Sequence, residues 1–238
     1  MAETVEHRHD LRREDDQFLA IITHELRQPL TPILAAVELL RRHVSAEADT
    51  RAENVIERQV KQLARLIEDL LDLERMAQGR MRLRKQRIEI GKVIADAVES
   101  VRWAADAHGV RLIVECGPDH LFLVADPDRL QQVLSNLLLN AMEHTPREGT
   151  ISITVAVCQR GVEITVQDTG AGIVPEMLDE VFTLFTQSSD GDVRGLGIGL
   201  AVVRSLVELH GGTVMARSAG RNQGSAFVVT LPTAAEAA

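Results

Sequence analysis

Glycine is distributed unevenly along this sequence of 238 residues, and its distribution divides the chain. Only Gly79 lies before residue 88, and the other fifteen of the sixteen glycines follow it. Charge changes at the same place. Residues 1–87 carry sixteen basic and sixteen acidic side chains. Residues 88–238 carry ten basic and nineteen acidic side chains, so the whole net charge of −9 comes from this second part. The sequence therefore predicts two physically different parts that join near residues 80–90.

Composition excludes several classes of protein. An apolar fraction of 45% suffices for a sizeable core, and no run approaches the roughly 18 apolar residues that a membrane span needs. The charged N-terminus is not followed by the apolar stretch of a signal peptide. The acidic balance argues against a protein that coats nucleic acid. Cys116 and Cys158 lack the spacing of metal ligands, and we expect two reduced thiols in the core.

The first part is predicted to form a hairpin of two amphipathic helices. Apolar residues recur at steps of three and four from Leu19 to Val44 and again from Ile56 to Leu70. We expect Pro29 and Pro32 to bend the first helix, the stretch Ser45–Thr50 to form the turn, and Gly79 to cap the second helix. The apolar stripes are Leu19, Ile22, Leu26, Leu30, Ile33, Val37, Leu40 and Val44 on the first helix, and Ile56, Val60, Leu63, Ile67 and Leu70 on the second.

A single hairpin cannot cover both stripes, so we predict a homodimer in which two hairpins form a four-helix bundle. His24 lies between the stripe residues Ile22 and Leu26 and is expected to point toward water, with Glu25 beside it. Two interpretations stay open at this point. The pair is either a solvated histidine beside a solvated acid, or a nucleophilic imidazole whose proton the carboxylate accepts.

The second part is predicted to be an α+β sandwich, with helices on one face of a mostly antiparallel sheet. One helix is expected to place Trp103 on its apolar face. The predicted strands are 88–90, 111–116, 121–125, 151–157, 162–166, 213–216 and 226–231. The predicted helices are 93–107, 128–143, 175–182 and 199–210.

Three polar or glycine-rich segments of this part suggest a common ligand. Asn136 and Asn140 share one helix face, and His144 follows one turn later. Amide oxygens bind hard cations and amide N–H groups donate to phosphate, although a plain surface pair of amides is the alternative. At 168–172 a strand ends in Asp-Thr-Gly-Ala-Gly, where a carboxylate can accept from an adenine amino group. At 195–200 a glycine triplet opens a helix whose N–H groups suit phosphate; taken alone, this triplet is weak evidence, and a flexible loop is the alternative.

These segments resemble the transmitter core of a sensor histidine kinase over nearly the whole chain, from about Phe18 to Pro232. Five motifs and a small sixth one occur in the family's order. Residues 18–30 resemble the H box, residues 130–145 the N box, and residues 168–173 the first glycine box; Phe182 and Phe185 match the F box, residues 195–200 the second glycine box and residues 224–227 a small third one. The resemblance implies a hairpin followed by an ATP-binding domain of the Bergerat type.

The resemblance also implies roles for individual residues. His24 would be the phosphoacceptor and Glu25 its general base. Asn140 would hold Mg²⁺, Asn136 would support the phosphates of ATP, and Asp168 would recognise adenine. A lid would cover ATP at about residues 186–198. The other implied nucleotide-site residues are His144, Gly170, Gly172, Ile173, Phe185, Arg194, Gly195, Leu196, Gly197, Ile198, Gly199 and Leu200.

Three positions depart from the family pattern. Gln28 stands where Thr or Asn is more frequent, which leaves phosphatase activity open. Glu143 replaces a frequent basic residue, and Arg194 is the only cation of a short lid.

We thus expect a charged helical lead-in at 1–17, too short to be a sensor, a dimerisation and phosphotransfer domain at 18–82, and a catalytic domain at 83–238. The expected function is autophosphorylation of His24 from ATP and transfer to an aspartate of a response-regulator receiver domain, in the cytoplasm. Two alternatives are kept. One is an ATPase or serine kinase of the same fold, which would lack the hairpin with its His-Glu pair. The other is a pseudokinase scaffold that docks a receiver domain without phosphorylating it.

Overall fold

The structure is a computed structural model that describes residues 22–23, 26–43, 45–117, 120–184, 186 and 197–233. The chain divides into two compact units, Met1–Asp72 and Leu73–Ala238. Among the described residues, no helix combines the length and apolar character needed to cross a bilayer.

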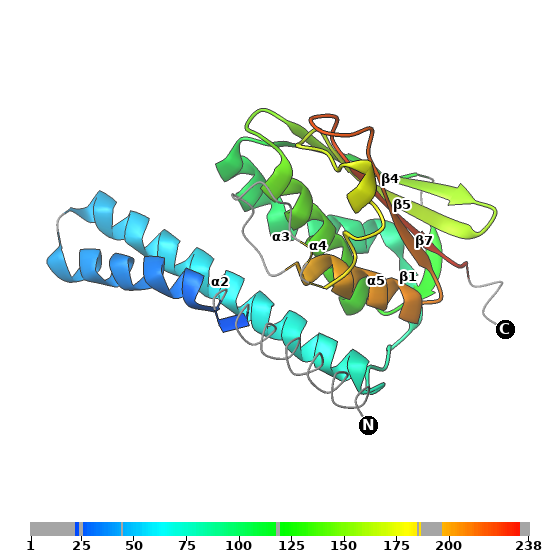
Figure 1. Cartoon of the computed structure of the whole chain (residues 1–238), viewed down its shortest axis with the longest axis horizontal. Coiled ribbons are helices and arrows are strands. Elements are labelled where there is room, and N and C mark those ends of the chain that lie inside the picture. The colour runs from blue at the N-terminus through cyan, green and yellow to red at the C-terminus, as the bar shows by residue number, and fades with distance from the viewer. Residues whose placement is uncertain are drawn as a thin grey trace, which may run out of the picture. The chain divides into compact units, whose positions relative to one another are not determined.

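The first unit holds a helical hairpin. Residues 26–42 are helical through both prolines, and α2 (Ala46–Ala77) runs back antiparallel to them (Figure 1). The prediction of a turn at Ser45–Thr50 is wrong beyond its first residue. Ser45 caps the helix, and the residues after it already belong to α2. Its Oγ accepts a hydrogen bond from the N–H of Ala48 at 3.2 Å, and Glu47 and Asp49 favour the positive end of the helix dipole.

Gly79 caps the C-terminal end of α2, as predicted. This glycine has φ +63°, and the N–H of Arg80 donates to the carbonyl of Arg75 at 2.8 Å while that of Gly79 donates to Met76 at 2.9 Å. These two bonds form a Schellman motif, which satisfies the last carbonyls of the helix.

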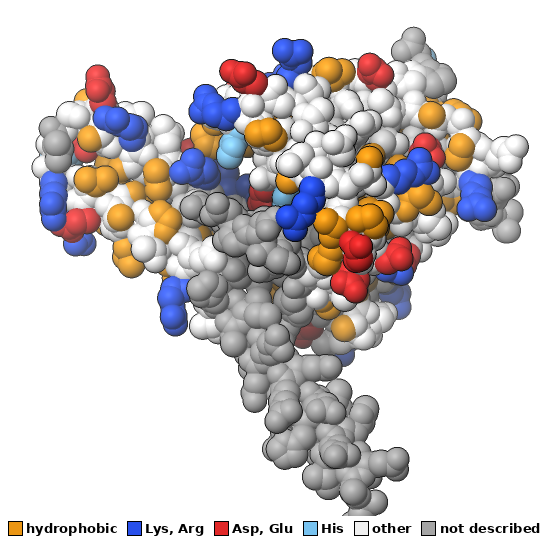
Figure 2. Space-filling model, turned by 45° about the horizontal axis from the view of Figure 1, so that its top comes forward, with side chains coloured by type: hydrophobic (Ala, Val, Ile, Leu, Met, Phe, Trp, Pro, Cys, Tyr) orange, Lys and Arg blue, Asp and Glu red, His pale blue; other side chains and the backbone are white. Residues whose placement is uncertain are grey.

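The hairpin leaves large apolar side chains at its surface (Figure 2). Leu34 is 69% exposed, although Ala36, two residues later on the same helix, is buried. Exposed apolar side chains of this size are unfavourable in water, and several of them on one hairpin are typical of a surface that a partner covers. The large apolar residues of the hairpin that are exposed are Leu30, Leu34, Leu39, Val60, Ile67 and Leu71.

The second unit is a sheet covered by helices on one face. The main sheet has the order β2-β4-β5-β7-β6, in which β2 pairs parallel to β4 and all other pairs are antiparallel; β1 and β3 form a separate antiparallel pair. The strands are β1 (Gln86–Glu89), β2 (Arg111–Glu115), β3 (Phe122–Ala125), β4 (Thr150–Cys158), β5 (Gly161–Asp168), β6 (Thr213–Arg217) and β7 (Ala226–Leu231). The helices are α3 (Ile90–His108), α4 (Pro127–His144), α5 (Gly199–Leu209) and the short 3₁₀ helix η1 (Pro175–Met177).

The core lies between α4 and the central strands (Figure 1). Leu134, Leu137 and Leu138 of α4 have no exposed surface, and neither do Ile164 and Val166 of β5. Burying a side chain of this size stabilises the fold by about 1.5–3 kcal/mol. The predicted hairpin followed by an α/β layered domain is confirmed.

Three further predictions for this unit are wrong. Trp103 is 58% exposed, because it lies nine residues, and hence half a rotation, from the buried Ile94 of α3. Cys116 is exposed at the end of an edge strand and Cys158 is half-buried; both are free thiols, but neither belongs to the core. The helix predicted at 175–182 is reduced to η1 and turns.

Candidate functional site

The carboxylate of Asp168 is held in one orientation at the end of β5. Its side chain is buried, and its Oδ1 accepts from the N–H groups of Gly170 at 2.7 Å and of Ser225 at 3.3 Å. The hydroxyl of Ser225 donates to Oδ2. A carboxylate has about four acceptor positions, so one remains for a donor such as an amino group.

The turn that follows Asp168 is fixed to α4 by its glycines. A Cβ on Gly170 would overlap the carbonyl oxygen of His144, and it would lie 2.9 Å from Oδ1 of Asp168. The same carbonyl of His144 accepts from the N–H of Ala171 at 3.1 Å. Gly172 has φ +69°, a conformation that side-chain-bearing residues rarely adopt. The turn therefore joins the end of α4 to the end of β5.

A second loop closes the turn from the other side. The N–H of Gly224 donates to the carbonyl of Gly170 at 3.1 Å, and the N–H of Ile173 donates to Oγ of Ser218 at 3.0 Å. Ile173 is half-buried in this position. Residues 168–173 and 218–225 thus form one rigid frame around the carboxylate of Asp168.

The face of α4 that carries Asn136 and Asn140 contacts the beginning of α5. Both amides are half-buried, and Nδ2 of Asn136 lies 3.4 Å from the carbonyl oxygen of Gly199. Ile198 is buried, whereas Gly197, with φ +64°, and Leu200 are half-buried.

Within the described residues, no side chain caps the first N–H groups of α5. An uncapped helix N-terminus next to amide side chains is a favourable place for an anion.

His144 ends α4 one turn after Asn140 and is half-buried. Burial lowers the pKa of His144, and the nearby carboxylate of Asp168 partly opposes this effect. The lowered pKa favours the neutral imidazole at pH 7, in which one ring nitrogen donates a hydrogen bond and the other accepts one.

Several predicted site residues lie outside the described residues, namely His24, Glu25, Phe185, Arg194, Gly195 and Leu196. Gln28 lies half-buried on the first helix of the hairpin unit. The structure brings together Asp168, Gly170, Gly172, Ile173 and His144 in one frame, and Asn136 with Gly199 in another contact.

Sequence reasoning missed Ser225 as a site residue. Its signal was present, because Ser225 lies within the third glycine segment 224–227, but nothing in the spacing linked it to Asp168. The link comes from the pairing of β5 with β7, which sets Gln167 opposite Ala226.

No group of three or more His, Cys, Asp or Glu side chains in the described part of the chain is placed to hold a metal ion. Asn140 nevertheless fits Mg²⁺, since Mg²⁺ is usually bound through few protein oxygens together with phosphate oxygens and water.

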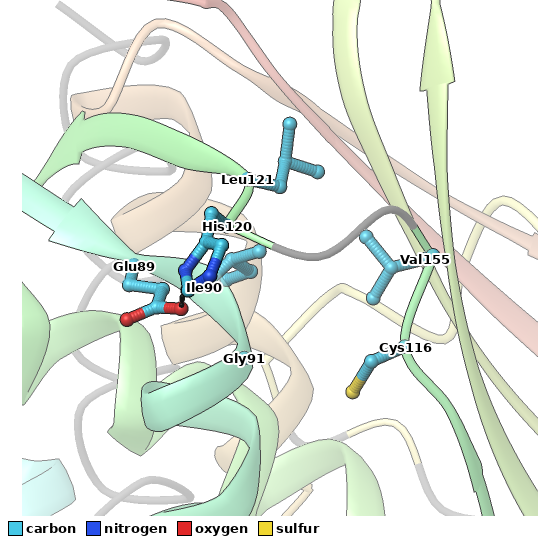
Figure 3. Close-up of a pocket in the computed structure, with 8 residues that line it drawn as sticks. Glu89, Ile90, Gly91, Cys116, His120, Leu121 and Val155 are labelled. Atoms are coloured by element: carbon cyan, nitrogen blue, oxygen red, sulfur yellow. Dashed lines mark hydrogen bonds and ion pairs between the residues drawn. The ribbon is translucent and has the colours of Figure 1, made fainter.

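A separate pocket lies between the start of α3, the end of β2 and the middle of β4, with Glu89, Cys116, His120 and Val155 at its wall (Figure 3). His120 and Glu89 pair with each other at 3.0 Å, and none of the predicted site residues lines this pocket.

Comparison with known proteins gives two family matches. Residues 125–235 match the family described as histidine kinase-, DNA gyrase B- and HSP90-like ATPase, and residues 14–79 match the His Kinase A (phospho-acceptor) domain.

Two curated relatives extend these matches over most of the chain. The chain is 36% identical over 214 residues to the sensor histidine kinase ZraS of Klebsiella oxytoca, which covers 89% of this chain and 44% of that protein. It is 34% identical over 232 residues to the adaptive-response sensory kinase SasA of Synechococcus elongatus, and this match covers 91% of this chain and 59% of that protein. The chain spans about half the length of these relatives.

Solved structures resemble the fold. Full-length ShkA in complex with AMPPNP has a TM-score of 0.67 and 27% identity, covering 91% of this chain and 46% of that one. The complex of histidine kinase ThkA with response regulator protein TrrA has a TM-score of 0.64 at 21% identity, covering 98% and 67%, which is a likeness of fold alone.

Proposed function

Because the chain belongs to the sensor histidine kinases of two-component signalling, we propose that it phosphorylates His24 from ATP and passes the phosphoryl group to a response regulator. The observation that carries this proposal is the carboxylate of Asp168, held buried by Ser225 and Gly170 with one acceptor position left. Such a group is suited to select adenine through its amino group.

The phosphates of ATP are proposed to lie between α4 and the start of α5. The uncapped N–H groups at Gly199 and Leu200 offer donors, and Asn136 and Asn140 offer amides on the facing helix. Asn140 would hold Mg²⁺, which supplies neutralisation of the charge on the phosphate oxygens. His144 offers a neutral imidazole at the end of the same helix face.

The transfer itself is proposed to be an in-line substitution at the γ-phosphorus. A nitrogen of His24 forms the new N–P bond, the bond to the bridging oxygen breaks, and ADP leaves. Glu25 accepts the imidazole proton. An aspartate of the receiver domain then takes the phosphoryl group from His24. Gln28, one turn after His24, would orient water if the same protein also dephosphorylates its partner.

The partners are proposed from the hairpin. Its exposed apolar residues, Leu34 above all, support a homodimer through a four-helix bundle. The match of residues 14–79 to the His Kinase A (phospho-acceptor) domain supports a receiver domain as the second partner. We propose domains at 18–82 and 83–238, and a cytoplasmic location, where ATP is available.

The direct test is incubation of the full chain with γ-³²P-labelled ATP and Mg²⁺. We expect a label that is stable in base and labile in acid, that is lost in His24→Gln, and that is retained in His43→Gln. His43 is a matched control because it is an exposed histidine at the tip of the same hairpin. Labelling that persists in His24→Gln would refute the assignment.

The scaffold alternative makes a different prediction for the same samples. A scaffold would bind ATP with normal affinity, and no label would appear on the wild-type chain or on a receiver domain. The named relatives are kinases, so this alternative is less favoured.

A further inference from the structure

A buried polar pair, Asp126 and His210, joins α4 and α5 at the ends opposite to the proposed nucleotide site. The two residues are 5% and 4% exposed. The N–H of Asp126 donates to Nε2 of His210 at 3.1 Å, and Nδ1 of His210 lies 2.8 Å from the carbonyl oxygen of Leu206. These partners require a neutral imidazole that carries its proton on Nδ1.

The same pair fastens the segment that links α2 to β1, which we call the connecting segment (residues 80–85). Oδ2 of Asp126 accepts from the N–H of Arg84 at 2.7 Å, while Oδ1 caps α4 by accepting from Arg129 at 3.3 Å. Nζ of Lys85 lies 3.4 Å from the carbonyl oxygen of His210. Two successive residues of the connecting segment are thus tied to the joint between α4 and α5.

The pair is too remote from the proposed nucleotide site to touch ATP. At 1.5 Å per residue, Asp126 lies about 15 Å along α4 from Asn136 and about 21 Å from Asn140. His210 lies about 16 Å along α5 from Gly199. A role of this pair in the reaction is therefore indirect, and the connecting segment is the element outside α4 and α5 that the pair holds.

We propose that Asp126 and His210 are positioning residues for phosphoryl transfer, which fix where the connecting segment joins the proposed catalytic domain (83–238). This inference rests on the proposed function. The connecting segment is the covalent tether through which that domain carries ATP to His24. The N–H groups of Arg80 and Met81 bind Arg75 at the end of α2, so only Arg82 and Leu83 separate the two attachments.

Releasing Arg84 lengthens the free backbone tether from two residues to four, because β1 begins at Gln86 and Lys85 is held only through the end of its long side chain. Doubling a flexible tether lowers the effective concentration of its ends about threefold, and loss of a fixed direction lowers it further. We therefore expect the transfer rate at saturating ATP to fall about three- to tenfold. ATP affinity is expected to stay within about twofold of the wild type, because α4 and α5 keep their nucleotide ends.

The test compares Arg84→Pro with Arg84→Ala and Arg82→Pro in the full chain. Arg84→Pro removes the backbone donor, Arg84→Ala removes only the exposed side chain, and Arg82→Pro adds the same ring where the described residues show no hydrogen bond from the N–H. Single-turnover labelling of His24 gives the rate, and a fluorescent ATP analogue gives the dissociation constant. Only Arg84→Pro is expected to slow labelling.

A second pair of variants tests the imidazole. His210→Phe removes the acceptor for Asp126 and is expected to slow labelling as Arg84→Pro does, whereas His210→Gln keeps an acceptor and is expected to restore part of the rate. If His210→Phe does not fold, the rate of labelling in Arg84→Pro still tests the inference, because Arg84 is exposed and its replacement leaves the core intact.

Three outcomes overturn the inference while leaving the proposed function intact. They are an unchanged rate in Arg84→Pro, an equal loss in Arg82→Pro, and a dissociation constant that rises in parallel with the loss of rate. A wild-type chain that shows no label on His24 overturns both the proposed function and this inference.

Discussion

The hydroxyl of Ser225 donates a hydrogen bond to the carboxylate of Asp168, a residue 57 positions earlier in the chain. Two backbone N–H groups hold the other oxygen of that carboxylate, so Ser225 is the only side chain in the described structure that orients Oδ2. The hydroxyl thereby decides which acceptor position faces a ligand.

Ser225→Ala is expected to weaken ATP binding by about tenfold or more, because a hydrogen bond to a charged group contributes about 1.5–3 kcal/mol. Ser225→Thr keeps the hydroxyl and is expected to bind ATP nearly as tightly as the wild type. Calorimetric titration with a non-hydrolysable ATP analogue measures both. Equal affinities in Ser225→Ala and the wild type would show that Asp168 does not depend on this bond.

Gly199 offers a test for a ligand at the start of α5. A Cβ at this position would lie 3.8 Å from Nδ2 of Asn136, which is ordinary contact, so Gly199→Ala is expected to leave the free energy of unfolding unchanged or raised by up to about 1 kcal/mol. ATP affinity is nevertheless expected to fall about tenfold, because the methyl group occupies space proposed for phosphate. Thermal unfolding and nucleotide titration separate the two effects.

The control for this prediction is Gly91→Ala in the first turn of α3, where a Cβ meets nothing within 4 Å. We expect Gly91→Ala to leave ATP affinity unchanged. An equal loss of affinity in both variants would point to a general effect on the fold.

The pH dependence of stability should reflect His210. Burial lowers the pKa of His210, with a smaller contribution from Lys85, against the opposing effects of the carbonyl of Leu206 and of Asp126. Because the unfolded chain then binds the proton more tightly, the contribution of His210 is present above the ordinary pKa of about 6.5 and is lost as the pH falls from there toward the lowered folded value.

Chemical denaturation of the full chain between pH 8 and pH 5 measures this dependence. We expect the free energy of unfolding to fall below about pH 6.5, and His210→Gln to reduce the slope. His144 contributes with the same sign, since burial lowers its pKa as well. A slope unaffected by His210→Gln would contradict the prediction.

Much of the fold could be predicted from patterns within single elements. The step of three and four from Ile56 to Leu70 gave α2, Asp126-Pro127 marked the start of α4, and Gly79 marked the end of the hairpin. Each of these signals is local, because helix periodicity and capping depend on residues within a turn or two.

Contacts between elements could not be predicted in this way. Ser225 meets Asp168 only because β7 pairs with β5 in one register, and His210 meets Asp126 only because α5 ends beside the start of α4. Trp103 was misplaced for the same reason, since one apolar side chain on a helix does not tell which face the sheet covers. Spacing along one helix could place Asn136 and Asn140 on one face, but not the Gly199 carbonyl beside them.

Asn140 is expected to govern the dependence on Mg²⁺. Asn140→Ala removes the side-chain oxygen, and labelling is expected to fall at least a hundredfold, whereas Asn140→Asp keeps an oxygen and should retain measurable labelling. Gln131→Ala is a matched control, because nine residues place Gln131 on the opposite side of α4. Titrating Mg²⁺ at fixed ATP measures the effect. Normal labelling of Asn140→Ala at low Mg²⁺ would move the metal to other residues, and equal loss in Gln131→Ala would assign the effect to the helix.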